Sequence, residues 1–398
     1  MKYESVAVLD VRSHEVTFMI GARGLNDTFV FNAAKTEENG WVSKEGFADE
    51  AAYLEAINAA VSSVRKNFVG QVKKITVSVP AAFTKIYTKG HTLSFDGKRK
   101  ISVQDIERLY ESGLNQLCAE GRCVKSSAMY FVLGDNRKYF DERSVIGATS
   151  PSLRGALCYY FVDDNFYRIT YNALKAQGYQ EICFVPSTLA QITYLLPEKT
   201  REGYAVFVDM GYVTTSVSVV YGNGIVHEET YDVGYGYVVA QLMQELSVSM
   251  EKAESILMES GVSARPIPID VVYTDADGGV YSAYVINETI KCALDKLCEG
   301  ITKFLDDNYR EKAATQFSSN PVYLTGEGIE KIVGAAEHIS KRTNRLTRVV
   351  YPDLPYYDKP NFSSRISLLN AATKDVQAKG MIEKIFRLFG GRKNDGLR

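Results

Sequence analysis

Two stretches of the chain share one pattern of apolar and polar positions. Each has a short apolar run that ends in an aspartate, then a polar turn, then a second β-rich run that ends in glycine. The stretches are SVAVLDVRSHEVTFMIG at 5–21 and YAVFVDMGYVTTSVSVVYG at 204–222. Short apolar runs bounded by turn residues are typical of buried strands. Because the pattern recurs half a chain later, with Asp10 and Asp209 in matching places, it predicts two related halves.

The segments that follow each copy also match in outline. In the first half we expect strands at 28–35, 73–80 and 181–185 and helices at 48–67, 166–177 and 187–196. In the second half we expect strands at 224–233 and 321–326 and helices at 236–246 and 328–342. Three antiparallel strands followed by alternating helices and strands predict an α/β fold with helices covering each sheet. The alternative is one irregular α/β domain in which the two stretches resemble each other by chance.

A segment with its own pattern interrupts the first half at 81–160. It opens with a β-rich run at 83–95 and a predicted turn at 96–100, and strands at 127–134 and 153–162 close it. A helix begins at Ser102 with Asp105 three positions on, which is the spacing of a capping box. We interpret this segment as an inserted α+β module.

A second segment, at 247–317, interrupts the second half. It contains a helix at 249–260, a β-rich run at 267–286 and a long helix through 292–305, and predicts a small subdomain. The predicted units are a first half at 1–80 and 161–199, the inserted module at 81–160, a second half at 200–246 and 318–378, the small subdomain at 247–317 and a C-terminal tail at 379–398.

Composition agrees with a globular protein and excludes some classes. Hydrophobic residues make up 45% and charged residues 24% of the 398 positions, and the formal net charge is -2. A balance this close to neutral gives no reason to expect nucleic acid as a partner. There is no N-terminal leader pattern and no spanning run of roughly 18 apolar residues, so we expect a cytoplasmic location. The six scattered cysteines are expected to be reduced packing residues.

The C-terminal tail combines an apolar face with positive charge. At ~100° per residue, six apolar side chains fall on one side of a helix: Met381, Ile382, Ile385, Phe386, Leu388 and Phe389. Lys384 and Arg387 lie on the opposite side with Glu383. From position 374 onward seven basic side chains stand against three acidic ones. These features predict an amphipathic helix that binds anionic lipids, and a terminal helix packed on the body is the alternative.

Paired strand–Asp–turn–strand units resemble those of the actin, Hsp70 and sugar-kinase superfamily, with its duplicated α/β domains. Within it, the inserted module and the basic tail are similar to FtsA, a family of bacterial cell-division proteins. This resemblance implies a protein that self-assembles into filaments, binds ATP with Mg²⁺, and holds the C-terminal peptide of FtsZ. It also implies a peripheral location on the inner face of the cell membrane at the division site, together with other division proteins.

The resemblance implies a nucleotide site, and this chain departs from it at several positions. The family's first phosphate loop, similar to D-I-G-T-S-K, reads DVRSHE at 10–15, and the second, similar to D-I-G-G-G-T-T, has Tyr212 and Val213 in place of two glycines. Side chains there obstruct the approach of backbone N–H groups to phosphates. The family's L-T-G-G-G has Glu327 in its middle, and its A-E-x-x-K motif has Leu257 in place of lysine.

The candidate nucleotide-binding residues implied by this alignment of motifs are Asp10, Arg12, Ser13, Asp209, Gly211, Thr214, Thr215, Gly234, Gly236, Glu254, Gly326 and Gly328. Asp10 and Asp209 would hold Mg²⁺ through the nucleotide. Because the positioning loops have changed, we expect a degenerate pocket that binds ATP weakly or not at all, and at most a weak ATPase. Retained binding in a modified pocket is the alternative, and we assign no catalytic residue.

The partner surface is the least clear part of the resemblance. The family's P-R-x-x-E-like helix corresponds to ETIKC at 288–292, which leaves Lys291 and Asp295 as candidate FtsZ-binding residues. The alternative function is that of PilM, an actin-fold scaffold of pilus or secretion assemblies, although PilM has no need of a lipid-binding tail. A sugar or acetate kinase of the same fold would require intact phosphate loops and a carboxylate base, and the sequence shows neither.

Overall fold

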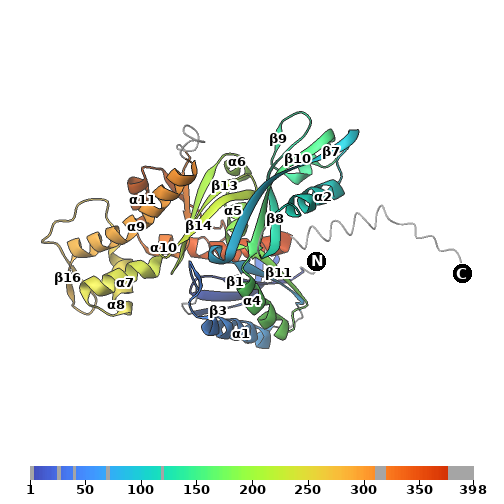
Figure 1. The fold of residues 1–398 in the computed structure, drawn as a ribbon. Coiled ribbons are helices and arrows are strands. Elements are labelled where there is room, and N and C mark those ends of the chain that lie inside the picture. The colour runs from blue at the N-terminus through green and yellow to red at the C-terminus, as the bar shows by residue number, and fades with distance from the viewer. Residues whose placement is uncertain are drawn as a thin grey trace.

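The structure is a computed structural model that describes residues 4–24, 28–38, 42–68, 72–117, 121–309 and 320–374. The predicted tail at 379–398, with all its candidate lipid-binding residues, lies outside these ranges. The chain forms two five-stranded mixed sheets, a four-stranded antiparallel sheet and two short hairpins (Figure 1). No helix among the described residues is long and apolar enough to cross a membrane.

The first half is built on a sheet with the strand order β11–β6–β1–β2–β3. Its strands are β1 (Val6–Val11), β2 (Glu15–Arg23), β3 (Phe29–Glu38), β6 (Lys74–Val79) and β11 (Glu181–Pro186). Helices α1 (Glu50–Asn67) and α4 (Asp164–Ala176) cover one face (Figure 1). Leu9 points to that face and Val8 to the other, as alternation along a strand requires. A hairpin of β4 (Val42–Ser43) and β5 (Gly46–Phe47) lies between β3 and α1.

The second half repeats this plan, with the order β14–β13–β12–β17–β18. Its strands are β12 (Ala205–Met210), β13 (Thr215–Tyr221), β14 (Gly224–Tyr231), β17 (Val322–Thr325) and β18 (Thr347–Val349). Its helices include α7 (Tyr235–Leu246), α10 (Glu327–Lys331) and α11 (Ala335–Thr343). In both halves the strand that contains the aspartate lies between one antiparallel and one parallel neighbour. The predicted duplication and the α/β class are confirmed.

One predicted helix of the second half is wrong. The sequence favoured a continuous helix at 328–342, but the chain breaks between α10 and α11. Gly334 has φ +84°, a left-handed conformation that ends helical hydrogen bonding and that glycine adopts at little cost. A side chain there would also collide with the Val262 carbonyl oxygen, which lies 2.1 Å from the ideal Cβ position.

The inserted module is a four-stranded sheet with the order β7–β10–β8–β9. Its elements are β7 (Thr84–Lys100), α2 (Val103–Leu114), β8 (Arg122–Val132), β9 (Lys138–Tyr139), α3 (Glu142–Val145) and β10 (Thr149–Val162), after a short 3₁₀ turn η2 (Ala81–Phe83). The capping box of Ser102 and Asp105 is confirmed. The turn predicted at 96–100 is wrong, because β7 continues through it with a register shift opposite Pro151, which has no N–H for the ladder.

The module packs on the β13–β14 hairpin of the second half. Gly222 in that hairpin has φ +58°, and its Cβ position lies 1.7 Å from the Met129 carbonyl oxygen of β8. The Asn223 amide donates to the Phe140 carbonyl at 2.7 Å, and the Lys138 ammonium donates to the Tyr221 hydroxyl at 2.7 Å. A backbone approach this close excludes a side chain at position 222, so the hairpin and the module are held together.

The small subdomain consists of α8 (Met250–Ser260), a hairpin of β15 (Val272–Thr274) and β16 (Val280–Ser282), and α9 (Ala283–Tyr309). Residues 283–286 were predicted to be β-rich, but they form the first turn of α9. Ile286, Ile290 and Leu294 of this helix are buried at helical spacing, so packing decides in favour of the helix.

The last described helix, at 363–374, returns to the first half. The 3₁₀ turn η3 (Pro360–Phe362) directly precedes it. Two further helices, α5 (Ser187–Leu195) and α6 (Glu198–Arg201), lie between β11 and β12 along the chain. Leu368, Leu369 and Ala372 pack with Val8 and its neighbours on the face of the first sheet that α1 leaves open. This helix, in orange-red in Figure 1, ties the end of the second half to the start of the first. The exact boundaries of the predicted units remain predictions.

Candidate functional site

A cavity of about 570 Å³ lies where the two halves meet. It is lined by Arg12, His14, Glu15, Thr36, Glu38, Tyr212, Met250, Glu254, Glu327, Lys331, Asn361 and Arg365. These residues come from the turns after β1 and β12, from β2, β3, α8 and α10, and from the C-terminal segment. Two candidate nucleotide-binding residues, Arg12 and Glu254, therefore line this cavity, together with Glu327, the neighbour of the candidate Gly326.

Asp10 is completely buried at the end of β1. Its Oδ1 accepts hydrogen bonds from the hydroxyls of Ser78 at 3.0 Å and Ser364 at 2.6 Å. Its Oδ2 has no hydrogen-bond partner among the described residues. Burial raises the pKa of this carboxyl, against the opposing effect of the Arg12 guanidinium. Two serines and no open route to solvent make this aspartate part of the protein interior.

Arg12 occupies the space between the two halves. Its Nη1 donates to the Asn361 carbonyl at 3.0 Å, its Nη2 lies 3.8 Å from Asp209 Oδ1, and its Nη1 lies 3.9 Å from Glu15 Oε1. Burial by itself lowers the pKa of Arg12, but Asp209, Glu15 and Asp10 more than offset it, so the pKa is raised. A permanent cation therefore lies among the carboxylates that were expected to hold Mg²⁺.

The two expected phosphate loops contact each other directly. The Val213 N–H donates to Ser13 Oγ at 3.0 Å, and the His14 ring stacks on Tyr212 with 4.2 Å between centroids. The space left between the loops, next to Asp209, Gly211 and Thr214, is about 40 Å³. That volume holds no more than a few water molecules, so the phosphates of a nucleotide do not fit there in this arrangement.

Three backbone N–H groups of the second loop and of the start of α7 already have acceptors. The N–H of Gly211 donates to Thr214 O at 2.9 Å, that of Tyr235 to Gly211 O at 2.9 Å, and that of Gly236 to Tyr212 O at 2.8 Å. The Cβ position of Gly234 lies 2.2 Å from Tyr212 O, and that of Gly236 lies 2.6 Å from the Tyr212 ring. Because these two glycines have no side chain, the second loop packs directly against the start of α7. The N-terminus of a helix is otherwise a favourable place for a phosphate.

Thr215, the next residue of the second loop, is also engaged within the protein. Its hydroxyl donates to the Val233 carbonyl at 2.5 Å. Thr214 contributes its carbonyl oxygen to Gly211 and lines the small remaining space between the loops. The two threonines thus stabilise the β12–β13 turn and its contact with the segment before α7.

The third loop, at the start of α10, is equally crowded. Gly326 has φ +97°, and its Cβ position lies 2.4 Å from Asp209 Oδ1; that of Gly328 lies 2.5 Å from Met210 Cγ. Glu327 pairs with Lys331 at 2.6 Å and lies 3.6 Å from His14 Nε2. Burial raises the pKa of Glu327, but His14 and Lys331 outweigh it, and the pKa is lowered.

The charges around the cavity do not suit ATP. Four carboxylates line it (Glu15, Glu38, Glu254 and Glu327), against Arg12, Lys331 and Arg365. Arg365 already pairs with Glu15 at 2.5 Å, and the Tyr212 hydroxyl donates to Glu254 at 3.4 Å. A triphosphate would meet an acidic wall and cations that are already paired. The charges and existing ion pairs of this cavity therefore do not match those of Mg-ATP.

The sequence of the chain also matches one known protein. Over 307 residues, 75% of this chain, it is 22% identical to the cell division protein FtsA of Streptococcus pneumoniae serotype 2 (strain D39 / NCTC 7466). Over three quarters of its length the chain is therefore similar to an FtsA protein. The match spans 66% of that relative's length. No protein-family model matches the chain.

Several solved structures share the fold of this chain. The PilM–PilN type IV pilus biogenesis complex superposes with a TM-score of 0.59 at 11% identity, covering 94% of this chain and 99% of the other. MreB5 of Spiroplasma citri bound to AMPPNP gives 0.56 at 10% identity, covering 96% and 99%. EutJ of Carboxydothermus hydrogenoformans gives 0.52 at 11% identity, covering 93% and 90%. The fold is therefore actin-like.

The candidate partner residues of the FtsA-like chain both lie on α9, and both are paired. Lys291 donates to Glu288 at 2.8 Å. Asp295 accepts from His338 at 2.7 Å and from Arg342 at 2.8 Å. Neither lies in the cavity between the halves, so the structure separates them from the nucleotide candidates.

Sequence reasoning missed several residues of the site. Gln191 of α5 donates to Asp209 Oδ2 at 2.8 Å, Ser364 donates to Asp10, and Arg365 pairs with Glu15. Their positions are up to 354 residues away from their partners, and no local spacing indicates such contacts. The sequence showed that His14 and Tyr212 differ from the family's loop motifs, but it did not predict that their rings stack.

Proposed function

We propose that this chain is an actin-like scaffold of cell division that tethers FtsZ filaments to the cytoplasmic face of the membrane. The observation that carries the proposal is the match to FtsA over three quarters of the chain, on a duplicated actin-like body with an inserted module. The C-terminal tail supports it, because an apolar face with a basic surplus suits anionic lipids.

In this proposal the scaffold does not depend on ATP for its closed shape. The guanidinium of Arg12 lies where a bound cation was expected, and the Ser13–Val213 and His14–Tyr212 contacts join the two halves directly. MreB5, with the same fold, has been seen with AMPPNP and with ADP. Here we expect Mg-ATP to bind weakly or not at all, and hydrolysis to be negligible.

The strength of membrane attachment depends on three contributions of the tail to the free energy: apolar burial, backbone ordering and basic charge. Burying six apolar side chains is worth ~1.5–3 kcal/mol each, while ordering the backbone costs about 1–2 kcal/mol per residue. These terms nearly cancel, and each basic side chain adds about 1 kcal/mol at an anionic surface. A single tail would therefore bind weakly, and many tails on one filament would bind firmly, which is the arrangement that a filament tether needs.

The first experiment measures sedimentation of the full chain with liposomes that contain anionic lipids. The chain should bind, Phe386→Glu should release it, and Glu383→Gln, a change on the polar side of the same segment, should leave binding intact. Unchanged binding of Phe386→Glu would show that the tail is not the anchor.

The second experiment asks whether the liposome-bound chain recruits FtsZ filaments. Recruitment should require both the tail and the C-terminal peptide of FtsZ, and charge reversal by Lys291→Glu should weaken it if α9 forms part of the contact. A chain that binds the membrane but never recruits FtsZ would contradict this division role. A protein of the PilM kind would instead bind a pilus-assembly partner and would not need its own tail; the shared fold does not separate the two, and the sequence match favours FtsA.

A further inference from the structure

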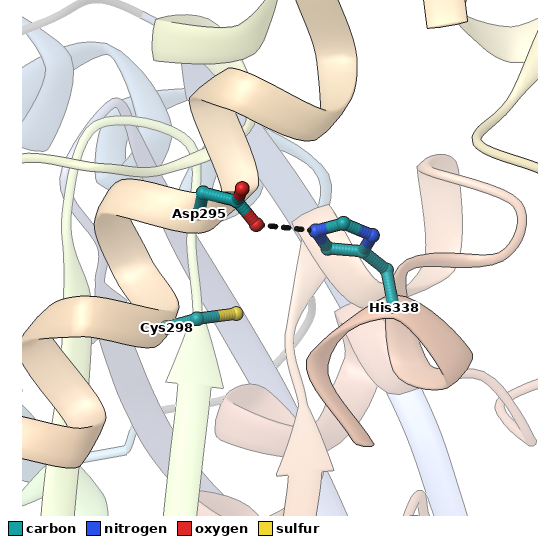
Figure 2. Close-up of side chains that lie close together, drawn as sticks. All are labelled: Asp295, Cys298 and His338. Atoms are coloured by element: carbon teal, nitrogen blue, oxygen red, sulfur yellow. Dashed lines mark hydrogen bonds and ion pairs between the residues drawn. The ribbon is translucent and has the colours of Figure 1, made fainter. Parts of the chain in front are cut away.

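Three side chains with metal-binding atoms converge on the outer side of the second half, away from the cavity between the halves. Asp295 and Cys298 lie one turn apart on α9, and His338 faces them from α11 (Figure 2). Their donor atoms all lie within 4.8 Å of one another. Cys298 and His338 are buried, and Asp295 is partly exposed.

The orientation of the imidazole suggests a shared ligand. The Asp295 carboxylate and the Cys298 thiol lie on the same side of the His338 ring, the side of Nε2 (Figure 2). In a nucleophilic relay the acid and the thiol would contact opposite nitrogens of the ring, so that one orients it and the other gives up a proton. Here an oxygen, a sulfur and a nitrogen face one common point, as the ligands of a metal ion do.

The surroundings of the cluster favour a cation. A cavity of about 410 Å³ adjoins Cys298 and is lined by Glu299, Thr302, Lys303, Asp306, Asp307 and Arg342. Together with Asp295 these groups contribute four carboxylates against two basic side chains. The cavity also leads from solvent to the buried thiol, which a metal ion needs for entry.

We propose that Asp295, Cys298 and His338 bind one Zn²⁺ ion, with a water molecule in the fourth position. Carboxylate oxygen, thiolate sulfur and imidazole nitrogen are the ligand types that zinc accepts in tetrahedral sites. Donor atoms around such an ion are roughly 3.3–3.8 Å apart, given the usual bond lengths, so the side chains close in by about 1 Å. Arg342, which already donates to Asp295 at 2.8 Å, stays as a hydrogen-bond partner of that ligand.

Proton release accompanies binding. The hydrogen bond of Nε2 to Asp295 is replaced by a bond to the metal, so the neutral ring carries its proton on Nδ1. The thiol gives its proton to solvent and becomes a thiolate. Because this proton must leave, metal affinity rises with pH. The bound ion links α11 to α9 and makes the packing of these two helices more rigid.

The test uses the full chain titrated with Co²⁺ and then with Zn²⁺. Tetrahedral cobalt with a thiolate ligand gives a ligand-to-metal charge-transfer absorption, so a single equivalent of Co²⁺ should produce this band and Zn²⁺ should displace it. Cys298→Ser should abolish the band and weaken zinc at least about tenfold, and Asp295→Asn should weaken zinc while the thiolate band remains.

The matched control is Cys292→Ser, an exposed cysteine on the same helix, which should keep both the band and the affinity. Zinc should also raise the unfolding temperature of the unaltered chain and of Cys292→Ser, but not that of Cys298→Ser. The proposal is overturned if the unaltered chain gives no thiolate band, if Cys298→Ser retains it, or if Cys292→Ser loses it equally.

Discussion

At the scale of single residues, Arg12 has the largest consequence for this protein. It is 8% exposed, and its charge offsets Asp10, Asp209 and Glu15 between the two halves. Arg12 therefore supplies a fixed positive charge at the place where the resemblance had implied a nucleotide-bound Mg²⁺.

Removing this cation should destabilise the fold. Arg12→Ala leaves buried carboxylates without their positive partner, and we expect a loss of about 3 kcal/mol in the free energy of unfolding. Urea denaturation followed by circular dichroism measures it. Arg168→Ala removes an exposed arginine that donates to Asn165, and it should change stability by less than about 0.5 kcal/mol. Equal effects of the two substitutions would show that Arg12 has no special role.

His14 should make stability depend on pH. Burial lowers the pKa of His14 below 6.5, more than Glu327 raises it, so the folded chain favours the neutral ring. Above pH ~6.5 the ring is neutral in both states and its contribution to stability is complete. As the pH falls below that value, the unfolded chain takes up the proton first, and stability is lost until the folded pKa is passed.

The substitution that isolates this effect is His14→Phe, which keeps a ring to stack on Tyr212 and cannot titrate. The stability difference between the unaltered chain and His14→Phe should change between pH ~6.5 and lower values, in favour of Phe at low pH. His91→Gln in the inserted module serves as the comparison. A difference that is constant with pH would contradict the assignment.

At the scale of elements, the β12–β13 turn takes the place that a nucleotide's phosphates would need. Tyr212 and Val213 fill it, and the carbonyl of Tyr212 accepts the Gly236 N–H at the start of α7. The strands and helices around the site follow the duplicated plan, and the loop residues fill the space between the halves. The obstacle to a ligand therefore lies in the loops.

Restoring glycine should reopen the pocket. The triple change Arg12→Gly, Tyr212→Gly and Val213→Gly removes the inter-loop cation, the stack and the β-branched residue, and Mg-ATP affinity should rise at least about tenfold in isothermal titration. Tyr356→Gly, at a tyrosine that is 92% exposed, is the matched control. Sub-micromolar binding by the unaltered chain, or no gain in the triple variant, would mean that the loops are not the obstacle.

At the scale of the whole molecule, direct contacts between described residues join the halves. The helix at 363–374 packs on the first sheet, Ser364 contacts Asp10, and η3 contributes the carbonyl that Arg12 binds. Opening the halves would break these contacts together. The molecule should therefore keep one closed shape whether or not nucleotide is present.

Small-angle X-ray scattering tests this expectation directly. The radius of gyration of the unaltered chain should be the same with and without Mg-ATP, because no differential contact biases one shape over another. Arg12→Ala should increase it, since repulsion between the remaining carboxylates separates the halves. A contraction of the unaltered chain on adding Mg-ATP would contradict the closed arrangement.

The sequence alone predicted the features that depend on local spacing. The two strand–Asp–turn–strand units, the helices α1, α4 and α7, and the capping box at Ser102 all follow from periodicity and from residues a few positions apart. The sequence also showed where the two loops differ from the family's phosphate-loop motifs, because a residue other than glycine restricts the backbone conformation at that position. Predictions failed where a long-range partner decides: at the β7 bulge opposite Pro151, and at the break before α11 beside Val262.

Only the tertiary structure decided what the departures do. The position of Arg12 among three carboxylates, the donation of Gln191 to Asp209, and the meeting of Cys298 with His338 join segments that are far apart along the chain. The free energy of such contacts depends on burial and on the distance between charges, and neither is encoded in a short window of sequence. Local pattern determined the elements, and packing determined the chemistry between them.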